Sequence, residues 1–416
     1  MKILYVISSF RHGEGGHLHS LRDLIENLGH AGITAIVVVI ETGKRTAVFD
    51  GVECAQFHLP FEEIKEFESV IHGLKSIVER ERPDVIHSFD NPSLFFSMYL
   101  SRVFRRPFIH TKPGGPNRGF FPKIPYLIVY SEENREYFAG NPKFKNTEIF
   151  FLPQRMSKVV PDLPRIKKLK EKLGLKSNAT FLRITRIADV YRESILKSID
   201  LIKKLNAAGF KSNLITIGVE ESGPLYDEIK NREDESVRIV TESEYTERAD
   251  SLIDIADYVI GVGNSLMAAA SLSRILLTTP SDARYPLIVD EENFSRLFWN
   301  NFRCTAPPRT DFKPNEERSY ETLKGLLTNE NKRKAYRVFS SDLFRKYFDV
   351  NLAKERYVSI YKELRYSGDI GISDYYYRLK YTLMAYNDNS ENKVRKIKFN
   401  LLNLKIAVLT LIDALF

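Results

Sequence analysis

The feature that most constrains the fold is the alternation of short apolar runs with amphipathic segments along most of the chain. Residues 1–9 and 35–40 are rich in β-branched and aromatic side chains, as buried strands are. Between them, residues 17–30 carry leucine and isoleucine at helical spacing and end near two glycines. Strands that alternate with helices in this way predict parallel sheets with helices on both faces. The expected fold class is therefore α/β, of the doubly wound type.

The alternation falls into two series. The first continues with strands near 84–88, 107–111, 126–131 and 148–153. The second has strands near 180–185, 213–218, 237–240, 257–263 and 275–278. The 416 residues thus predict an N-terminal Rossmann-like domain over 1–160 and a C-terminal one over 177–345. We interpret the proline- and lysine-rich stretch 161–176 between them as a basic linker.

The formal net charge of +8 is concentrated in three basic tracts, 101–123, 164–176 and 393–416, on an otherwise mildly acidic chain. Because the excess is local, and no RRM, zinc-finger or helix-turn-helix pattern accompanies it, we do not expect nucleic acid as a partner. Cys54 and Cys304 have no cysteine near them in sequence, which excludes a cysteine metal site and fits a reducing compartment.

Residues 393–416 place Lys393, Arg395, Lys396 and Lys398 ahead of a run of leucine, isoleucine and valine. A basic start followed by an apolar amphipathic stretch is typical of a helix that lies in a membrane interface. The alternative is a helix docked on its own domain or on a partner subunit. No stretch of the chain reaches the ~18 uncharged apolar residues of a membrane span.

The first strand leads into a glycine-rich loop, GEGGH at 13–17, that opens a helix. Glycines there let a phosphate approach the backbone amides of a helix N-terminus, so Gly15 and Gly16 are candidate phosphate contacts. A dinucleotide-binding loop needs a small residue where Leu18 stands, which argues against an NAD(P) oxidoreductase. A tight strand-to-helix turn without a ligand is the other interpretation.

Basic residues also gather just beyond another strand of the first series, where α/β sheets bind their ligands. His110, Lys112 and Arg118 lie in a tract that leaves this strand and enters a loop dense in glycine and proline. A buried turn would explain the glycines and prolines but not the three basic side chains. We therefore take these three residues as candidate site residues.

The second series offers two further candidates for an anion site. Arg186 follows the strand near 180–185, and Arg192 begins the next helix. Two guanidinium groups near a helix N-terminus suit a pyrophosphate through bidentate contacts, although separate surface arginines are the alternative. A glycine-rich turn, GVGNS at 261–265, also joins a strand to a helix and is a second candidate nucleotide cradle.

Six segments in this order resemble glycosyltransferase family 4, whose members are retaining enzymes of the GT-B fold. They are the Gly15-Gly16 loop, RPDVIH at 82–87, HTKPGGPN at 110–117, YSEEN at 130–134, Arg186 with its following helix, and ADYVIGVG at 256–263. The resemblance spans roughly 1–365 and implies two Rossmann-like domains facing a cleft, the first binding the acceptor and the second the donor nucleotide. It also implies a crossover helix, here 346–366, that returns to the first domain ahead of a tail over 367–416.

The resemblance further implies roles for individual residues. His110 is expected beside the transferred sugar as the catalytic residue. The position of Lys112 and Arg118 beyond the same strand places them on the acceptor or phosphate side. Arg192 stands near the place of a lysine that the family pairs with its arginine. The donor-binding residues implied are Gly15, Gly16, Arg186, Arg192, Gly263, Asn264 and Ser265.

The chain departs from the family at the Glu-x7-Glu motif, where Ile260 and Ala268 stand in place of the two acids. No Asp-x-Asp motif occurs either, so metal-dependent sugar transfer is disfavoured.

The leading hypothesis is a hexosyltransferase that moves a sugar from a UDP- or GDP-sugar to a lipid-linked or surface-polysaccharide acceptor, with retention, without metal and without a further cofactor. We expect it in the cytoplasm, peripheral on the inner face of the cytoplasmic membrane, as a homo-oligomer or with a protein partner. The alternative is a catalytically inactive GT-B subunit that acts as a scaffold or partner of an active glycosyltransferase.

Overall fold

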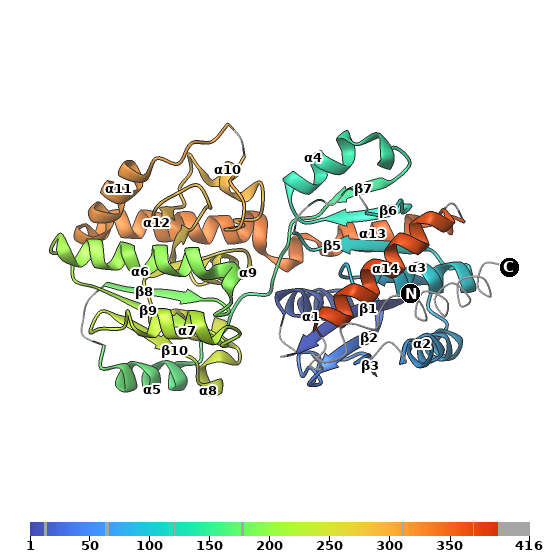
Figure 1. Cartoon of the computed structure of the whole chain (residues 1–416). Coiled ribbons are helices and arrows are strands. Elements are labelled where there is room, and N and C mark those ends of the chain that lie inside the picture. Colours follow the sequence, from blue (N-terminus) through green and yellow to red (C-terminus); the bar gives the residue numbers. More distant parts are fainter. Residues whose placement is uncertain are drawn as a thin grey trace. The chain divides into compact units, whose positions relative to one another are not determined.

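A computed structural model describes residues 1–11, 15–62, 66–115, 117, 119, 121–175, 179–309, 311–368 and 370–389. The chain divides into two compact units, each with its own sheet and its own core (Figure 1). The N-terminal unit is Met1–Gln154 together with the C-terminal segment that begins at Val350, and the C-terminal unit is Arg155–Asp349. Among the described residues, no helix combines the length and the apolar character needed to cross a membrane.

The sheet of the N-terminal unit has seven parallel strands among the described residues, in the order β3-β2-β1-β4-β5-β6-β7. They are β1 (Lys2–Arg11), β2 (Thr34–Gly43), β3 (Ala55–Pro60), β4 (Val85–Ser88), β5 (Phe108–Lys112), β6 (Tyr126–Val129) and β7 (Glu148–Phe151). The sequence did not predict β3. This edge strand is half-buried and carries Gln56 and His58, so it lacks the apolar run that marked the others.

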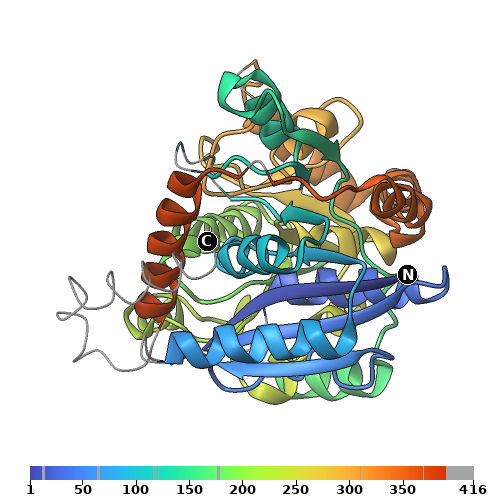
Figure 2. The same cartoon turned by 90° about the vertical axis from the view of Figure 1, so that its right-hand side faces the viewer.

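Helices cover both faces of this sheet, as a doubly wound fold requires. They are α1 (Gly16–Gly29), α2 (Phe67–Glu81), α3 (Leu94–Phe104), α4 (Glu132–Gly140), α13 (Lys354–Glu363) and α14 (Ile372–Asn389). α1 and α13 contribute to one apolar cluster, whereas α2, α3 and α14 contribute to the cluster on the other face. Figure 2 shows α13 and α14 on opposite sides of the sheet.

The C-terminal segment returns to the N-terminal unit at Val350 and is part of its core. α14 lies within the stretch 367–416 that we interpreted from the sequence as a tail. However, Tyr375, Leu379 and Leu383 are buried in the cluster that includes α3. The Tyr375 hydroxyl also donates to the carbonyl of Met98 at 3.2 Å. Residues 372–389 are therefore a packed element of the fold, whereas the basic amphipathic segment 393–416 lies outside the described residues.

The sheet of the C-terminal unit has the order β10-β9-β8-β11-β12-β13 over the described residues, and only β13 is antiparallel in it. The strands are β8 (Ala179–Ile184), β9 (Ser212–Ile217), β10 (Val237–Val240), β11 (Tyr258–Gly261), β12 (Ile275–Thr278) and β13 (Leu287–Ile288). The helices are α5 (Leu163–Leu173), α6 (Arg192–Ala207), α7 (Gly223–Lys230), α8 (Ser243–Thr246), α9 (Asn264–Ser271), α10 (Phe294–Phe298), α11 (Glu316–Thr328) and α12 (Glu330–Leu343). Both sheets are thus Rossmann-like, as the alternation of strands and helices predicted.

The structure corrects the interpretation of 161–176 as a linker, because α5 occupies most of this stretch. The Asp162 side chain caps the helix by accepting from the Arg165 amide at 3.1 Å, and Ile166 and Leu169 are buried in the core. The lysines of α5 face solvent, where Lys172 pairs with Glu242 at 2.6 Å. The high charge of one helix face concealed the apolar spacing of the other.

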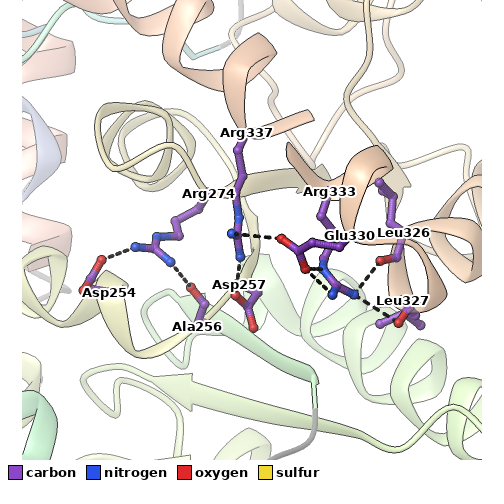
Figure 3. A network of polar contacts seen from close by, with 9 residues as sticks. All are labelled: Asp254, Ala256, Asp257, Arg274, Leu326, Leu327, Glu330, Arg333 and Arg337. Atoms are coloured by element: carbon purple, nitrogen blue, oxygen red, sulfur yellow. Dashed lines mark hydrogen bonds and ion pairs between the residues drawn. The ribbon is translucent and has the colours of Figure 1, made fainter. Parts of the chain in front are cut away.

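A network of arginines fixes α12 at the amino ends of β11 and β12 (Figure 3). Arg274 bonds to Asp254 and to the carbonyl of Ala256, and Arg337 bonds to Asp257 at 2.7 Å. In the same network, Glu330 pairs with Arg333. These guanidinium groups are structural, and they lie at the edge of the sheet opposite the carboxyl ends of the strands.

Candidate functional site

In the N-terminal unit, the carboxyl ends of β1 and β4 meet at the point where the strand order reverses, which is where open α/β sheets bind ligands. Asp90, only 5% exposed, follows β4 at this point. Its carboxylate accepts from the amides of Ser8 and Ser93, each at 2.7 Å. His17 Nε2 lies 2.9 Å from the Ser8 carbonyl and 3.6 Å from the Asp90 carboxylate. Asp90 thus holds the two strand ends together.

Asp90→Ala is expected to lower the free energy of unfolding by about 3 kcal/mol, because it removes the charged acceptor of two buried amides. Urea unfolding followed by circular dichroism measures this. Asp84→Ala is the matched control, since Asp84 accepts from the Lys2 amide at 2.7 Å but at the exposed amino end of β1, where water replaces it. Equal losses in the two variants would contradict the assignment.

The glycine loop after β1 is close-packed where it enters α1. A Cβ on Gly15 would lie 2.4–2.5 Å from the His17 imidazole, so a larger residue there would displace that ring. Gly16 is exposed as the first residue of α1. The structure therefore gives Gly15 a packing reason as well as the predicted place at a helix N-terminus, and the preceding residues 12–14 lie outside the described part.

His110, the predicted catalytic residue, is fully buried inside β5. Its Nδ1 lies 3.0 Å from the Ser88 hydroxyl, and its ring centroid lies 5.6 Å from that of Phe121. Nε2 has no hydrogen-bond partner among the described residues. Burial lowers the pKa of His110 well below its usual value, so the ring is neutral. In this conformation the imidazole is a core side chain that a sugar cannot contact.

Lys112 is also buried, at 1% exposure, at the end of β5. Its ammonium donates to the carbonyls of Gly114 and Gly115 at 2.7 and 2.8 Å. The Asn134 side-chain oxygen lies 3.4 Å away. Lys112 therefore fixes the glycine loop after β5 instead of presenting its charge to a ligand, and Arg118 lies outside the described residues.

A second buried cluster joins α13 to the centre of the same sheet. His87 lies 2.8 Å from the Tyr361 hydroxyl through Nδ1 and 2.7 Å from the Thr111 hydroxyl through Nε2. The Tyr361 hydroxyl is 3.0 Å from that of Tyr5. Burial lowers the pKa of His87 from 6.5 to about 3, so the folded chain holds a neutral imidazole over a wide pH range.

Acidification is therefore expected to destabilise the N-terminal unit. Unfolded chain takes up a proton on His87 below pH 6.5, whereas folded chain does so only near pH 3. Stability from this residue is complete above pH 6.5 and falls by about 1 kcal/mol for each pH unit below it. Urea midpoints measured between about pH 7 and pH 4 test this. His87→Gln, which does not titrate, should reduce the slope, and part of it should remain because burial also lowers the pKa of His110. An unchanged slope in that variant would contradict the assignment.

In the C-terminal unit, the strand order reverses between the adjacent strands β8 and β11. Arg186, half-exposed, follows β8 at this edge. Its Nη1 lies 3.2 Å from both carboxylate oxygens of Glu221, and its Nη2 lies 3.4 Å from the Tyr191 hydroxyl. The guanidinium also lies 5.4 Å from the Tyr191 ring centroid. The predicted phosphate-binding arginine is thus at the ligand edge, in contact with an acid that a phosphate would have to displace.

Arg192 does not share that partner. It begins α6, and its Nε and Nη2 bond to Glu228 of α7 at 2.7 and 2.5 Å. The structure therefore holds the two predicted guanidinium groups in separate ion pairs and does not show them converging on one position.

The turn from β11 to α9 consists of Val262 and Gly263, and Gly263 has a φ of +46°. The Ser265 hydroxyl donates to the Val262 carbonyl at 3.0 Å and accepts from the Val262 amide at 3.1 Å. A Cβ on Gly261 would lie 2.2 Å from that hydroxyl. The Ser265 side chain therefore closes the turn, and the backbone of Gly263 and Asn264 remains the candidate anion contact at the α9 N-terminus.

The two positions that replace the acids of the Glu-x7-Glu motif are buried. Ile260 lies inside β11 and Ala268 inside α9, at 0% and 1% exposure. Both belong to apolar clusters of the C-terminal unit. An acid at either position of this chain would point into the core.

Sequence reasoning missed several residues at this edge. Gly218, directly after β9, is so close to β8 that a Cβ on it would lie 1.7 Å from the Thr185 carbonyl oxygen. Glu221, from the loop after β9, and Tyr191, from the 3-10 helix Asp189–Tyr191, contact Arg186, and neither segment carried a recognisable motif. The one sequence signal among these residues is that Gly218 directly follows a buried strand. This signal does not indicate that Thr185 is its neighbour.

The two units define the class of fold: a pair of Rossmann-like α/β units, as in GT-B glycosyltransferases. The chain is similar in structure to a glycosyltransferase from Rickettsia africae, with a TM-score of 0.62 and 14% identity over 87% of this chain and 98% of that one. Anabaena HepE, solved in complex with UDP-glucose, gives a TM-score of 0.63 and 12% identity over 88% of this chain and 100% of HepE. A UDP-GlcNAc 2-epimerase from Neisseria meningitidis bound to UDP-GlcNAc gives a TM-score of 0.52 and 14% identity over 86% of this chain and 99% of the epimerase.

These similarities confirm the predicted fold class. No protein-family model matches the sequence, and the comparison with curated proteins finds no match. At 12–14% identity the similar structures establish the fold alone, so they do not single out family 4.

Proposed function

We propose that the chain is a glycosyltransferase that uses a nucleotide-diphosphate sugar as its donor. The observation that carries this proposal is the half-exposed Arg186 at the carboxyl end of β8, beside the glycine turn that ends β11 and starts α9. A guanidinium and a helix N-terminus at a topological switch point suit a diphosphate. The similarity to Anabaena HepE, solved with UDP-glucose, supports a UDP-sugar in the same kind of fold.

We further propose a hexosyltransferase that acts on a lipid-linked or surface-polysaccharide acceptor. The composition of 393–416 supports a position at the inner face of the cytoplasmic membrane, because basic residues ahead of apolar ones suit an anionic bilayer surface. Retention of configuration, independence of metal and the absence of a further cofactor follow from the resemblance to family 4 and from the lack of an Asp-x-Asp motif.

The test is turnover of a panel of UDP- and GDP-sugars, with and without a membrane glycolipid fraction as acceptor. We expect release of UDP or GDP from one donor, undiminished by EDTA, and an anomeric configuration in the product that matches the donor. Release that EDTA abolishes would overturn the metal-independent mechanism. A folded chain that releases nothing from any donor would overturn the enzymatic function.

A catalytically inactive GT-B subunit is the second candidate, as a homo-oligomer or with a protein partner. Three observations favour it: His110 and Lys112 are buried, and α9 carries no acid. Such a subunit should bind no nucleoside diphosphate even at millimolar concentration, whereas the transferase should bind one. Co-purification with an active glycosyltransferase would then identify its role.

A further inference from the structure

The C-terminal unit contains a guanidinium in its interior. Arg183 is the next-to-last residue of β8 and is 1% exposed. It is the largest of the fully buried side chains among the described residues. Phe181, two residues earlier on the same face of the strand, lies in an apolar cluster with Ile195 and Ile199 of α6. An apolar residue would fit such surroundings better than a cation does.

Two serines of α6 are its hydrogen-bond partners. Nη2 donates to the Ser194 hydroxyl at 2.6 Å, and Nη1 donates to the Ser198 hydroxyl at 3.2 Å. Each hydroxyl donates its own proton to a backbone carbonyl one turn back, that of Tyr191 at 2.9 Å and that of Ser194 at 2.8 Å. The serines therefore act on Arg183 as neutral acceptors and supply no negative charge.

The charge of Arg183 has no acidic partner within the described part of the chain, where the titratable side chains that interact with it electrostatically are Cys304 and Tyr191. No carboxylate there forms an ion pair with it, and its Nε has no acceptor. Burial lowers the pKa of Arg183 to about 10, so the group is still a cation at neutral pH. Because a buried and unpaired charge is costly, its presence is explained best by an anion that binds nearby.

The position of Arg183 indicates where that anion binds. Three residues further on, Arg186 leaves the carboxyl end of the same strand, and the Ser194 partner lies in the first turn of α6. The positive end of the α6 dipole and the buried guanidinium therefore add at the loop 185–191. In a medium of low dielectric constant, such a charge acts over a longer distance than it would in water.

We propose that Arg183 is a positioning residue for a nucleoside diphosphate. The positive charge of Arg183 attracts the phosphates to the loop after β8, although the guanidinium does not contact them. This inference rests on the proposed function. It gives Arg183 the role of second cation that the sequence assigned to Arg192, whose charge is already paired with Glu228.

The test compares Arg183→Met with the wild-type full chain, using UDP, UMP and GDP as probes in calorimetry and urea unfolding for stability. We expect Arg183→Met to unfold at the same or a higher urea concentration, because an unpaired buried charge is removed. We expect Arg183→Met to bind UDP about tenfold more weakly than the wild type does. Its affinity for UMP should fall by a smaller factor than its affinity for UDP. Retained UDP affinity in this variant would overturn the proposal.

Arg274→Met is the matched control, since it removes a guanidinium of the same unit from the amino edge of the sheet. It leaves Asp254 without its ion pair, so stability should fall while UDP affinity is unchanged. If Arg183→Met loses stability and affinity together, Arg183→Lys decides: recovery of UDP affinity supports a role of the charge, and no recovery overturns it. If the wild-type chain binds neither UDP nor GDP, the proposed function is overturned and this inference with it. If the wild-type chain binds UDP and Arg183→Met binds it with the same affinity, the inference alone is overturned.

Discussion

Gly218→Ala is expected to destabilise the C-terminal unit by about 4 kcal/mol or more, because overpacking against the backbone is among the mechanisms that cause losses of this size. The new Cβ would lie 1.7 Å from the Thr185 carbonyl oxygen and 2.8 Å from its carbonyl carbon. These are backbone atoms, so no side-chain rotation relieves the overlap. The loops after β8 and β9 must separate, and the Thr185 amide then loses its bond to the Ile217 carbonyl, which is 3.0 Å long. Because Arg186 is the next residue, the candidate donor site is disrupted with the fold.

Gly223→Ala is the control for this prediction. Gly223 begins α7, and the nearest atom to its Cβ position is a Glu220 carboxylate oxygen at 3.8 Å, an ordinary contact. Alanine is the better helix former, so this variant should be as stable as the wild type or slightly more stable. Urea unfolding of both variants measures the difference. A Gly218→Ala variant as stable as Gly223→Ala would mean that the β8 and β9 loops do not pack as described.

Arg186→Ala is expected to weaken UDP or GDP binding and lower kcat/KM by about 100-fold, because a bidentate charged contact to the diphosphate is lost. The free energy of unfolding should change by less than about 1 kcal/mol, since the Arg186–Glu221 pair is half-exposed. This combination separates a binding residue from a structural one. Donor titration and steady-state turnover, with unfolding as the check on folding, measure it.

Arg232→Ala is the control for Arg186→Ala. Arg232 forms an exposed pair with Asp200 at 3.0 Å, so its removal costs as little stability but removes no proposed donor contact. Equal effects of the two variants on nucleotide affinity would indicate a general charge effect instead of a site at Arg186.

The fold could be predicted from the sequence where apolar periodicity was strong. Buried parallel strands such as β2 and β11 read as continuous apolar runs, and both were found at the expected places. β3 was missed because an edge strand needs no such run, and α5 was mistaken for a linker because its lysines outnumber its two buried apolar residues. Apolar periodicity in the sequence therefore reveals a strand or helix only where most residues on one of its faces are buried.

The candidate site could be predicted only to the level of position. A residue directly after a parallel strand must lie at the carboxyl edge of the sheet, which is why Arg186 and Gly263 are where the sequence placed them. The direction and partners of a side chain depend on residues distant in sequence. No sequence pattern therefore indicated that His110 and Lys112 are buried, or that Arg183 has no carboxylate partner in the described structure.

Calorimetric titration of UDP and GDP into the full chain tests the central claim, a nucleoside-diphosphate site in the C-terminal unit, most directly. We predict saturable binding of at least one of the two, strongly weakened in Arg186→Ala and unchanged in Arg232→Ala. A folded wild-type chain that binds neither nucleotide at millimolar concentration would contradict the claim.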